Sequence, residues 1–552
     1  MSRLHSLGHQ QLRTPKQEGA EAHMEQLFAV ISSGPAITFP TISYKAIGPE
    51  IVLVVGALVV MLTTSLFPST RRTRTPSILA ALAALIAFAD SATMWANFAD
   101  HGPYRAIASS LTIDGFAVFM LITISATTFL GTLLGSAYLS EGRFGTGEFQ
   151  GLLLLSATGA MLLASAGDLI VIFLGLEILS IALYVLAGFE KRSGASGEAA
   201  LKYFILGGFS SALFLYGIAL TYGATGSTNI AKIAGFLASN SITSNGVLLA
   251  GMSLLIVGLG FKVAAVPFHL WTPDVYQGSP SASVGYMAAV AKAAGFAGLL
   301  RILVSALPTL RLDWQPIIWA LAALTLLVGA VLAVVQNDLK RMLAYSSINH
   351  AGFVLLGVEA ATSKGTSASI YYLLAYAFMV VATFAIVNSF EDRETGRVPL
   401  ENLRGLASRN PGIAFFLAVL LVAQAGAPLT TGLVAKFAVV SAVVAAHSYV
   451  LAVIAMLSAV IATFFYLRVV AVAYARGPRR RSLVRQPQMA MAATTGVAGE
   501  GETEVASAPL AEKVSLPVEA QIVVGIGVAG TVIFGIFPNY ILHMAEIAKV
   551  LL

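Results

Sequence analysis

About fourteen apolar runs, each roughly 20 residues long, follow one another along this chain. A run of this length spans a bilayer as a helix, and these runs are continuous rather than alternating, which disfavours a closed barrel. Charged residues make up only 11% of the sequence. A soluble domain carries about 25%. The sequence therefore predicts an all-α, polytopic membrane protein. The expected spans cover residues 47–67, 77–98, 111–139, 150–166, 168–189, 200–224, 246–266, 283–307, 316–335, 342–359, 368–390, 412–446 (broken), 449–475 and 519–547.

Several kinds of chemistry have no support in the sequence. The chain has no cysteine, which excludes thiolate-ligated iron–sulfur clusters, thiolate zinc sites and disulfides. Its eight histidines form no spaced ligand pair, and no glycine-rich phosphate loop follows a strand-like run. We therefore expect this chain to bind no cofactor and no metal, and to carry neither a redox centre nor an ATPase.

Basic residues gather after the odd-numbered spans. The largest groups follow spans one, eleven and thirteen: Arg71, Arg72 and Arg74; Arg393, Arg397, Arg404 and Arg409; Arg476, Arg479, Arg480, Arg481 and Arg485. The positive-inside rule places these loops in the cytoplasm and both termini outside. The N-terminal tail, with Arg3, Arg13 and Lys16, would then have to cross the membrane.

The chain divides into six expected parts. The tail over 1–44 lacks the apolar core of a signal peptide, and Met24 is an alternative start. The connector, rich in Ala, Gly, Thr and Glu, is expected to be flexible. The remaining parts are transmembrane, and the whole set is 1–44 (tail), 45–144 (three helices), 145–310 and 311–475 (two antiporter-like repeats), 476–517 (connector) and 518–552 (last helix).

Two spans are interrupted by proline, at Pro267 and Pro428, each with a lysine nearby. A matched pair of broken helices in two halves indicates inverted repeats with functional sites at the breaks. The segments 165–180 and 335–350 also show a weak likeness to each other. We therefore predict two inverted repeats, each containing one broken helix.

Five ionisable side chains interrupt apolar runs. They are Glu177, Lys202, Lys262, Lys292 and Lys436. A charge near the bilayer centre costs from about 3 to more than 10 kcal/mol, so such residues usually have a function. We interpret the set as a path for charge, most simply for protons. Lys202 lies near the start of its span, and it has a second interpretation, in which its ammonium reaches back to the headgroups.

Glu177 lies near the middle of its span, with Ser180 and Tyr184 on the same helical face. It is either a proton-binding carboxylate or a neutral, hydrogen-bonded one. Asp168, nine residues earlier, lies at a helix end, and we expect it to be structural.

Two histidines extend the path. His269 follows Pro267 in VPFHLW, where a broken helix frees backbone groups, and His350 shares a helical face with Ser346 and Asn349. Imidazole titrates near neutral pH and can pass protons on. The alternative for each is a hydrogen-bonded core histidine.

Long segments resemble a known family. The runs LKYFILGGFSSALFLYGIALTYG and GFKVAAVPFHLWTPDVYQGSPSASVGYMAAVAKAAGF are similar to the antiporter-like, proton-translocating membrane subunits of bacterial NADH–quinone oxidoreductase, respiratory complex I. The detail WTPDVYQGSP resembles the subunit N branch, whereas subunits L and M usually carry a WLPDA-type sequence. GAPLTTGLVAKF and YSSINHAGF are similar to further parts of that branch.

The resemblance implies a role for each matching residue. Glu177 and Lys262 would form the charge pair of the first half-channel, His269 and Lys292 the central connection, and Lys436 the end of the second half. It also implies a proton-pumping complex in the bacterial inner membrane. NADH, FMN, iron–sulfur clusters and quinone would belong to partner subunits, and subunits M and K would be neighbours.

Two alternatives to this function stay open at the level of sequence. One is a subunit of a multi-subunit cation/proton antiporter, which has the same ancestry and would show sodium-dependent transport. The other is a structural membrane subunit that conducts nothing, for which replacing Lys262 or Lys436 would leave pumping intact.

Overall fold

The computed structural model describes residues 42–552, apart from 140–145, 241–244, 393, 477–514 and 549–552. Contacts divide the chain into Met1–Ile42 and Ser43–Leu552, and the following description concerns the second unit. The expectations for the tail up to residue 41, including the start at Met24, and for the connector over 477–514 lie outside the described residues.

Helices dominate the described unit, and the all-α prediction is confirmed. The helices of the first half are α2 (Gly48–Leu66), α3 (Thr75–His101), α4 (Gly115–Leu139), α5 (Thr146–Ser165), α6 (Leu169–Ala187), α7 (Gly194–Thr225), α8 (Ile230–Ser239), α9 (Gly246–Val263), α10 (Trp271–Gly278) and α11 (Ser281–Leu300). Those of the second half are α12 (Arg311–Val334), α13 (Leu339–Glu359), α14 (Ser363–Val387), α15 (Leu406–Arg409), α16 (Pro411–Ala425), α17 (Thr431–Ala445), α18 (Tyr449–Tyr474), α19 (Val518–Ile536) and α20 (Asn539–Ile547).

Short elements join these helices. One antiparallel hairpin pairs β1 (Tyr104–Ala106) with β2 (Leu111–Ile113). A π-helical turn, Arg301–Ala306, continues α11. Single 3₁₀ turns cover Tyr44–Ile47, Pro68–Arg72, Pro308–Leu310, Asn388–Phe390 and Leu400–Leu403.

Twelve helices of the described residues are long and apolar enough to cross a membrane. Helix α13 has 21 residues but carries a polar face, and α16 and α17 have 15 residues each. If α13 and the broken pair α16 and α17 each cross once, the total agrees with the expected fourteen spans. The chain is therefore a multi-pass membrane protein.

Both expected breaks are present. Helix α9 ends at Val263, Ala264 takes a left-handed conformation with φ 62°, and α10 begins at Trp271 beyond Pro267. Helix α16 ends at Ala425, where Gly426 has φ 100°, and α17 begins at Thr431 beyond Pro428. Each break ends a helix inside a predicted span, so its last carbonyls are available to other partners.

The two segments that resemble each other in sequence begin their helices in the same way. Asp168 caps α6 by accepting the N–H of Ile170, and Asp338 caps α13 by accepting that of Arg341. The next residues also match, since Leu169 donates its N–H to Thr228 and Leu339 donates to Val398. These matched bonds support the two halves proposed from sequence, and their inverted symmetry stays a prediction.

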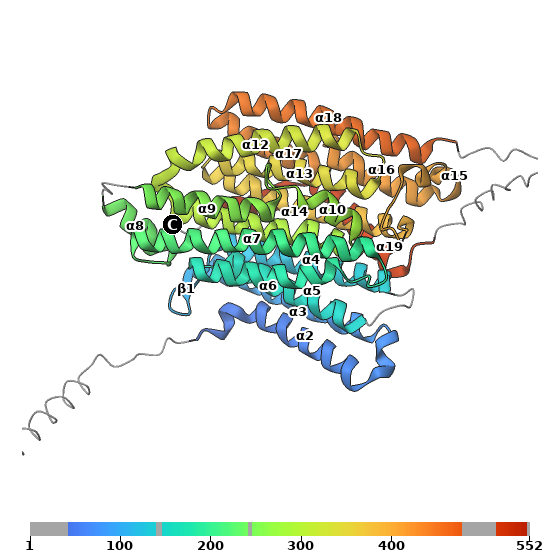
Figure 1. Ribbon diagram of the computed structural model, residues 1–552, viewed down its shortest axis with the longest axis horizontal. Coiled ribbons are helices and arrows are strands. Elements are labelled where there is room, and N and C mark those ends of the chain that lie inside the picture. The colour runs from blue at the N-terminus through green and yellow to red at the C-terminus, as the bar shows by residue number, and fades with distance from the viewer. Residues whose placement is uncertain (1–41, 140–145, 241–244, 393, 477–514, 549–552) are drawn as a thin grey trace, which may run out of the picture. The chain divides into compact units, whose positions relative to one another are not determined.

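Figure 1 shows the helices of this unit running side by side, with α2 and α3 at one edge and α18 at the other. Helices α11 and α14 are almost wholly buried, because small residues and aromatic rings fill all their sides. The outer helices α2, α3, α7 and α18 expose apolar side chains, as helices facing lipid or another membrane protein do.

Candidate functional site

Lys262 lies in the last turn of α9 and contacts two neighbouring helices. Its Nζ donates hydrogen bonds to Ser180 Oγ on α6, at 2.8 Å, and to Tyr203 OH on α7, at 3.2 Å. It also lies 5.4 Å from the centroid of the Tyr203 ring. The side chain is only 3% exposed, so these groups replace its hydration.

Glu177 lies one helical turn before Ser180 on α6. It interacts electrostatically with Lys262 and with Tyr184, so the expected pair is brought together. Its Oε1 is buried and has no hydrogen-bond partner in the described part of the chain. Ser180 Oγ accepts from Lys262 and donates to the carbonyl of Leu176 on its own helix.

Aromatic side chains connect this pair to α13. The Tyr203 ring stacks on Trp271 with centroids 4.5 Å apart, and Trp271 lies edge-on to Tyr276 at 6.4 Å. Tyr276 OH and Ser347 Oγ are 3.2 Å apart and share a hydrogen bond. Ser347 in turn accepts a bond at its carbonyl oxygen from Lys292 Nζ.

His350 lies on α13 between two lysines. Its Nδ1 is 2.7 Å from Tyr372 OH and its Nε2 is 3.0 Å from Tyr466 OH. The imidazole interacts electrostatically with both Lys292 and Lys436. A ring with a hydroxyl at each nitrogen can accept a proton on one side and release one on the other.

Lys436 occupies the second break. Its Nζ donates to the carbonyl of Ala425, the last residue of α16, at 2.8 Å, and lies 4.9 Å from the centre of the Phe353 ring. Because the last carbonyls of a helix carry partial negative charge, this helix end stabilises the ammonium.

The polar face predicted on α13 is present. Ser346 hydrogen-bonds Tyr466, and Asn349 Nδ2 donates to Ser458 Oγ at 2.6 Å. Both partners belong to α18, so this stripe faces the interface of α13 with α18. All of these side chains are buried.

Two predicted residues lie apart from this group. The Lys202 side chain is 42% exposed and pairs with Glu198 at 2.6 Å and Asp274 at 2.8 Å, in a surface pocket of about 420 Å³. Lys202 therefore does not lie among the buried groups of this structure, and its role in proton transfer stays a prediction. His269 is buried, but no hydrogen bond among the described residues joins it to Lys292.

Sequence reasoning missed two buried ion pairs. Arg301 makes a two-pronged bond to Asp114, at 2.6 and 2.8 Å, with both side chains 2% exposed. Lys340 pairs with Glu391 at 2.5 Å and is fully buried. Arg301 falls inside the predicted span 283–307. It is therefore an ionisable residue within an apolar run, the same signal that singled out the lysines.

The described residues offer no group of three or more His, Asp or Glu side chains that could hold a metal ion. Outside the spans, Asp392 lies beside the Lys340–Glu391 pair. Burial acts to raise the pKa of Asp392, but hydrogen bonds from the N–H groups of Glu394 and Thr395 outweigh it and lower that pKa.

Known proteins resemble this chain in sequence and in fold. The family described as NADH:quinone oxidoreductase/Mrp antiporter, TM, matches residues 166–462. NADH-quinone oxidoreductase subunit N of Trichlorobacter lovleyi is 37% identical over 92% of this chain and 97% of the relative. Subunit N 3 of Streptomyces griseus is 36% identical over 94% of this chain and 96% of the relative.

Solved structures agree with these sequence matches. A chain of respiratory complex I from Thermus thermophilus has a TM-score of 0.70 and 30% identity, covering 91% of this chain and all of that one. A chain of the Mrp complex from Dietzia sp. shares the fold with a TM-score of 0.77 at 21% identity, covering 92% of this chain and 97% of that one. With relatives matched over nearly their whole length and a buried row of lysines of the kind their resemblance implies, this chain belongs to the antiporter-like family, in the subunit N branch of NADH–quinone oxidoreductase.

Proposed function

We propose that this chain conducts protons across the bacterial inner membrane as a subunit of NADH–quinone oxidoreductase, through a chain of buried Glu, Lys and His side chains. The observation that carries the proposal is the row of ionisable groups whose lysines and histidine bond hydroxyl or backbone carbonyl groups of neighbouring helices. In order they are Glu177, Lys262, Lys292, His350 and Lys436, with His269 beside the first break.

The first step concerns Glu177 and Lys262. A proton arriving at the Glu177 carboxylate weakens its attraction for the Lys262 ammonium, because the pair loses one of its two charges. Ser180 Oγ contacts Lys262 directly, and its hydroxyl would have to turn from the Leu176 carbonyl towards Glu177 to relay a proton between them. Lys262 then gives up its proton towards the Tyr203 and Tyr276 hydroxyls.

The second step passes through α13. Lys292 contacts Ser347, and His350 responds to the charge of both Lys292 and Lys436. A proton gained at Lys292 therefore disfavours a proton at Lys436 through the intervening imidazole. Lys436 lies at the end of this row, where its proton would be released.

The size of the electrostatic coupling between two charges favours several proton-binding sites over a single one. Two unit charges about 10 Å apart at an effective dielectric of about 20 interact by about 1.7 kcal/mol. Moving one proton against about 150–200 mV requires roughly 3.5–4.6 kcal/mol. One coupling is too weak for this work, whereas a series of them is sufficient.

The energy source lies in other subunits under this proposal. NADH, FMN, iron–sulfur clusters and quinone would be bound there, and this chain would respond to the change of state that their reaction produces. Its exposed apolar helices fit contacts with membrane subunits, including the antiporter-like subunit M and the small subunit K. Both termini would lie in the periplasm.

Glu177→Gln tests the proposal, because glutamine keeps the shape of the side chain and cannot bind the proton. We expect proton pumping by the assembled complex to fall by about 100-fold or more, the scale of a lost proton-transfer group. Pumping is measured with a pH-sensitive dye in inside-out vesicles oxidising NADH in sodium-free medium.

Glu359→Gln is the matched control, since Glu359 is a buried carboxylate that accepts from Ser448 away from the row. It should pump normally. Normal pumping by Glu177→Gln, with equal amounts of complex, would contradict the proposal. Transport in wild-type vesicles that requires sodium would instead indicate the cation/proton antiporter.

A further inference from the structure

The surface pocket of about 420 Å³ lies between the first and the second half of the chain. Helices α7 and α10 of the first half line it, together with α13 and the segment after α14 from the second half. A volume of this size is typical of a small-molecule site, about 300–1,000 Å³. The charged residues of its lining are three basic and three acidic ones: Glu198, Lys202, Asp274, Arg341, Glu394 and Arg397.

Four of these six charges neutralise one another. Lys202 Nζ pairs with Glu198 at 2.6 Å and with Asp274 at 2.8 Å. Arg341 pairs with the same Asp274 at 2.9 Å. The other two charged side chains form no ion pair and no hydrogen bond within the described part of the chain, and they are those of Glu394 and Arg397. The pocket therefore has no net charge, but it presents one free carboxylate and one free guanidinium.

A tight turn carries these two free side chains. Asp392 Oδ1 accepts the N–H groups of Glu394 and Thr395, at 2.9 and 3.3 Å. The N–H of Gly396 donates to the Asp392 carbonyl at 2.7 Å. Gly396 has φ 67°, and an added Cβ would lie 2.7 Å from the Gln277 carbonyl oxygen on α10. Only glycine fits this position, so the turn has one defined conformation against α10.

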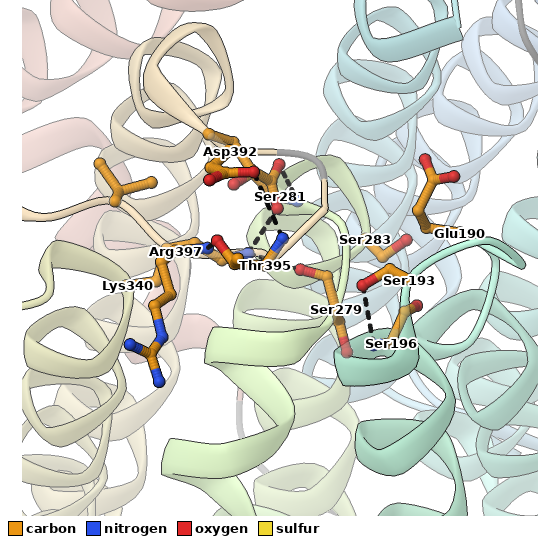
Figure 2. A network of polar contacts seen from close by, with 12 residues as sticks. Glu190, Ser193, Ser196, Ser279, Ser281, Ser283, Lys340, Asp392, Thr395 and Arg397 are labelled. Carbon is orange, nitrogen blue, oxygen red and sulfur yellow. Dashed lines mark hydrogen bonds and ion pairs between the residues drawn. The ribbon is translucent and has the colours of Figure 1, made fainter. Parts of the chain in front are cut away.

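Buried contacts anchor the turn. Glu391, just before it, pairs with the buried Lys340 at 2.5 Å and accepts the N–H of Ser281, the first residue of α11, at 2.9 Å. Ser193 Oγ, at the start of α7, donates to the Glu394 carbonyl at 2.8 Å. The turn of the second half is thus fixed to three helices of the first half. Figure 2 shows this network, with labels on Ser193, Ser281, Lys340, Asp392, Thr395 and Arg397 among others.

Further along α7, the face that lines the pocket becomes apolar. The lining residues of this helix follow one another at spacings of three, one and three, on one helical face: Ala195, Glu198, Ala199 and Lys202. The same spacing continues to Ile205, Leu206 and Phe209, which are between 42% and 68% exposed. We call these three residues the α7 stripe. The charged pocket is therefore continuous with an exposed apolar surface.

The length of α7 places the pocket at the depth of lipid headgroups. The helix has 32 residues, about 48 Å at 1.5 Å per residue, whereas the hydrocarbon core of a bilayer is about 30 Å thick. Its ends therefore extend beyond the hydrocarbon. Glu198 lies within the first two turns, and the ammonium of Lys202 reaches back to it. The α7 stripe begins one turn deeper, at the level of acyl chains.

We propose that this pocket binds the headgroup of an amine-bearing, zwitterionic phospholipid of the phosphatidylethanolamine class, whose acyl chains lie on the α7 stripe. The phosphate pairs with Arg397, because a guanidinium binds phosphate through two parallel hydrogen bonds. The ammonium pairs with Glu394. An anionic headgroup fits less well, because it would leave the Glu394 carboxylate without a partner beside another negative charge. The lipid joins α7 of the first half to the turn of the second half, and its binding does not depend on proton conduction.

Photocrosslinking to the purified complex that contains this chain tests the site. The probe is phosphatidylethanolamine with a photoreactive group in one acyl chain, added in detergent micelles, and the crosslinked residues are located by mass spectrometry. We expect crosslinks to the α7 stripe. Unlabelled phosphatidylethanolamine should compete about fivefold better than phosphatidylglycerol, the scale of one exposed ion pair. Free phosphoethanolamine, which lacks acyl chains, should not compete.

Two variants separate the contributions of the two headgroup charges. Arg397→Gln should weaken competition by both lipids about fivefold, because both carry the phosphate. Glu394→Gln should abolish the preference for phosphatidylethanolamine, because only that headgroup carries the ammonium. The matched controls are Arg404→Gln and Glu401→Gln, whose side chains are exposed a few residues further along the chain and do not line the pocket. Both controls should bind the lipids as the wild type does.

The site is refuted if the two lipids compete equally in the wild type, or if both pocket variants behave like their controls. A complex without crosslinks on α7 would show that a neighbouring subunit covers the stripe, which also overturns the proposal. Equal competition by free phosphoethanolamine would do the same, since it would indicate a water-soluble ligand. These outcomes leave the proposed function untouched, because Glu177→Gln tests that function separately in vesicles.

Discussion

Single residues were predictable where an ionisable side chain interrupts an apolar run. Lys262, Lys292 and Lys436 are buried as expected, and helical spacing correctly placed Ser180 and Tyr184 beside Glu177. Partners from distant helices were not predictable, since periodicity describes one helix at a time. The Tyr203 and Ser347 contacts depend on packing that no local pattern encodes.

Lys202 shows that an ionisable side chain in an apolar run is not always buried. It lies in an apolar run, yet it is only eight residues from the start of α7 and reaches Asp274 at the surface. Side chains of a helix lean towards its N-terminus, which brings this ammonium within reach of Glu198 and Asp274. The sequence pattern alone does not show whether a side chain in an apolar run is buried, so it could not predict that Lys202 is exposed.

Arg301 provides a prediction about stability. Arg301→Gln removes one member of the buried ion pair with Asp114, and breaking such a pair costs about 3–5 kcal/mol. We expect less assembled complex and a lower melting temperature of the purified complex. Arg311→Gln is the control, since Arg311 is exposed and hydrogen-bonds Gln315 at the molecular surface. Equal melting temperatures for the two variants would refute a structural role for the buried pair.

At the scale of elements, hydropathy gave helix positions close to those observed, because span length follows bilayer thickness. The breaks were also predictable from Pro267 and Pro428. The residues that turn the chain were not, since Ala264 and Gly426 adopt positive φ under tertiary constraint.

Gly426→Ala tests the second break. At φ 100° an alanine is strained by about 1–2 kcal/mol, and its Cβ would lie 3.2 Å from Lys436 Cδ. We expect the bond from Lys436 to Ala425 to be displaced and proton pumping to fall. Pumping and complex amount are measured together in vesicles.

Gly412→Ala is the control on the same helix α16, where an added Cβ meets nothing within 4 Å. It should assemble and pump normally. A Gly426→Ala complex that pumps as well as Gly412→Ala would show that the geometry of this break is not required.

For the whole molecule, composition and span count established a multi-pass membrane protein, and the family resemblance agrees with relatives matched over most of their length. How the two halves meet was not predictable. They meet at α13, where Ser347 contacts Lys292 and His350 responds to Lys436. The continuity of the buried row is thus a property of the packed molecule.

Proton pumping by Lys292→Met tests this continuity most directly, since Lys292 joins the two halves and methionine keeps its length without the charge. Lys364→Met is the control, because Lys364 is exposed and donates to Ser441 Oγ, away from the buried row. We predict that assembled Lys292→Met complex pumps about 100-fold less than Lys364→Met, the scale of a lost proton-transfer group. Equal pumping by the two variants, at equal amounts of complex, would contradict the account.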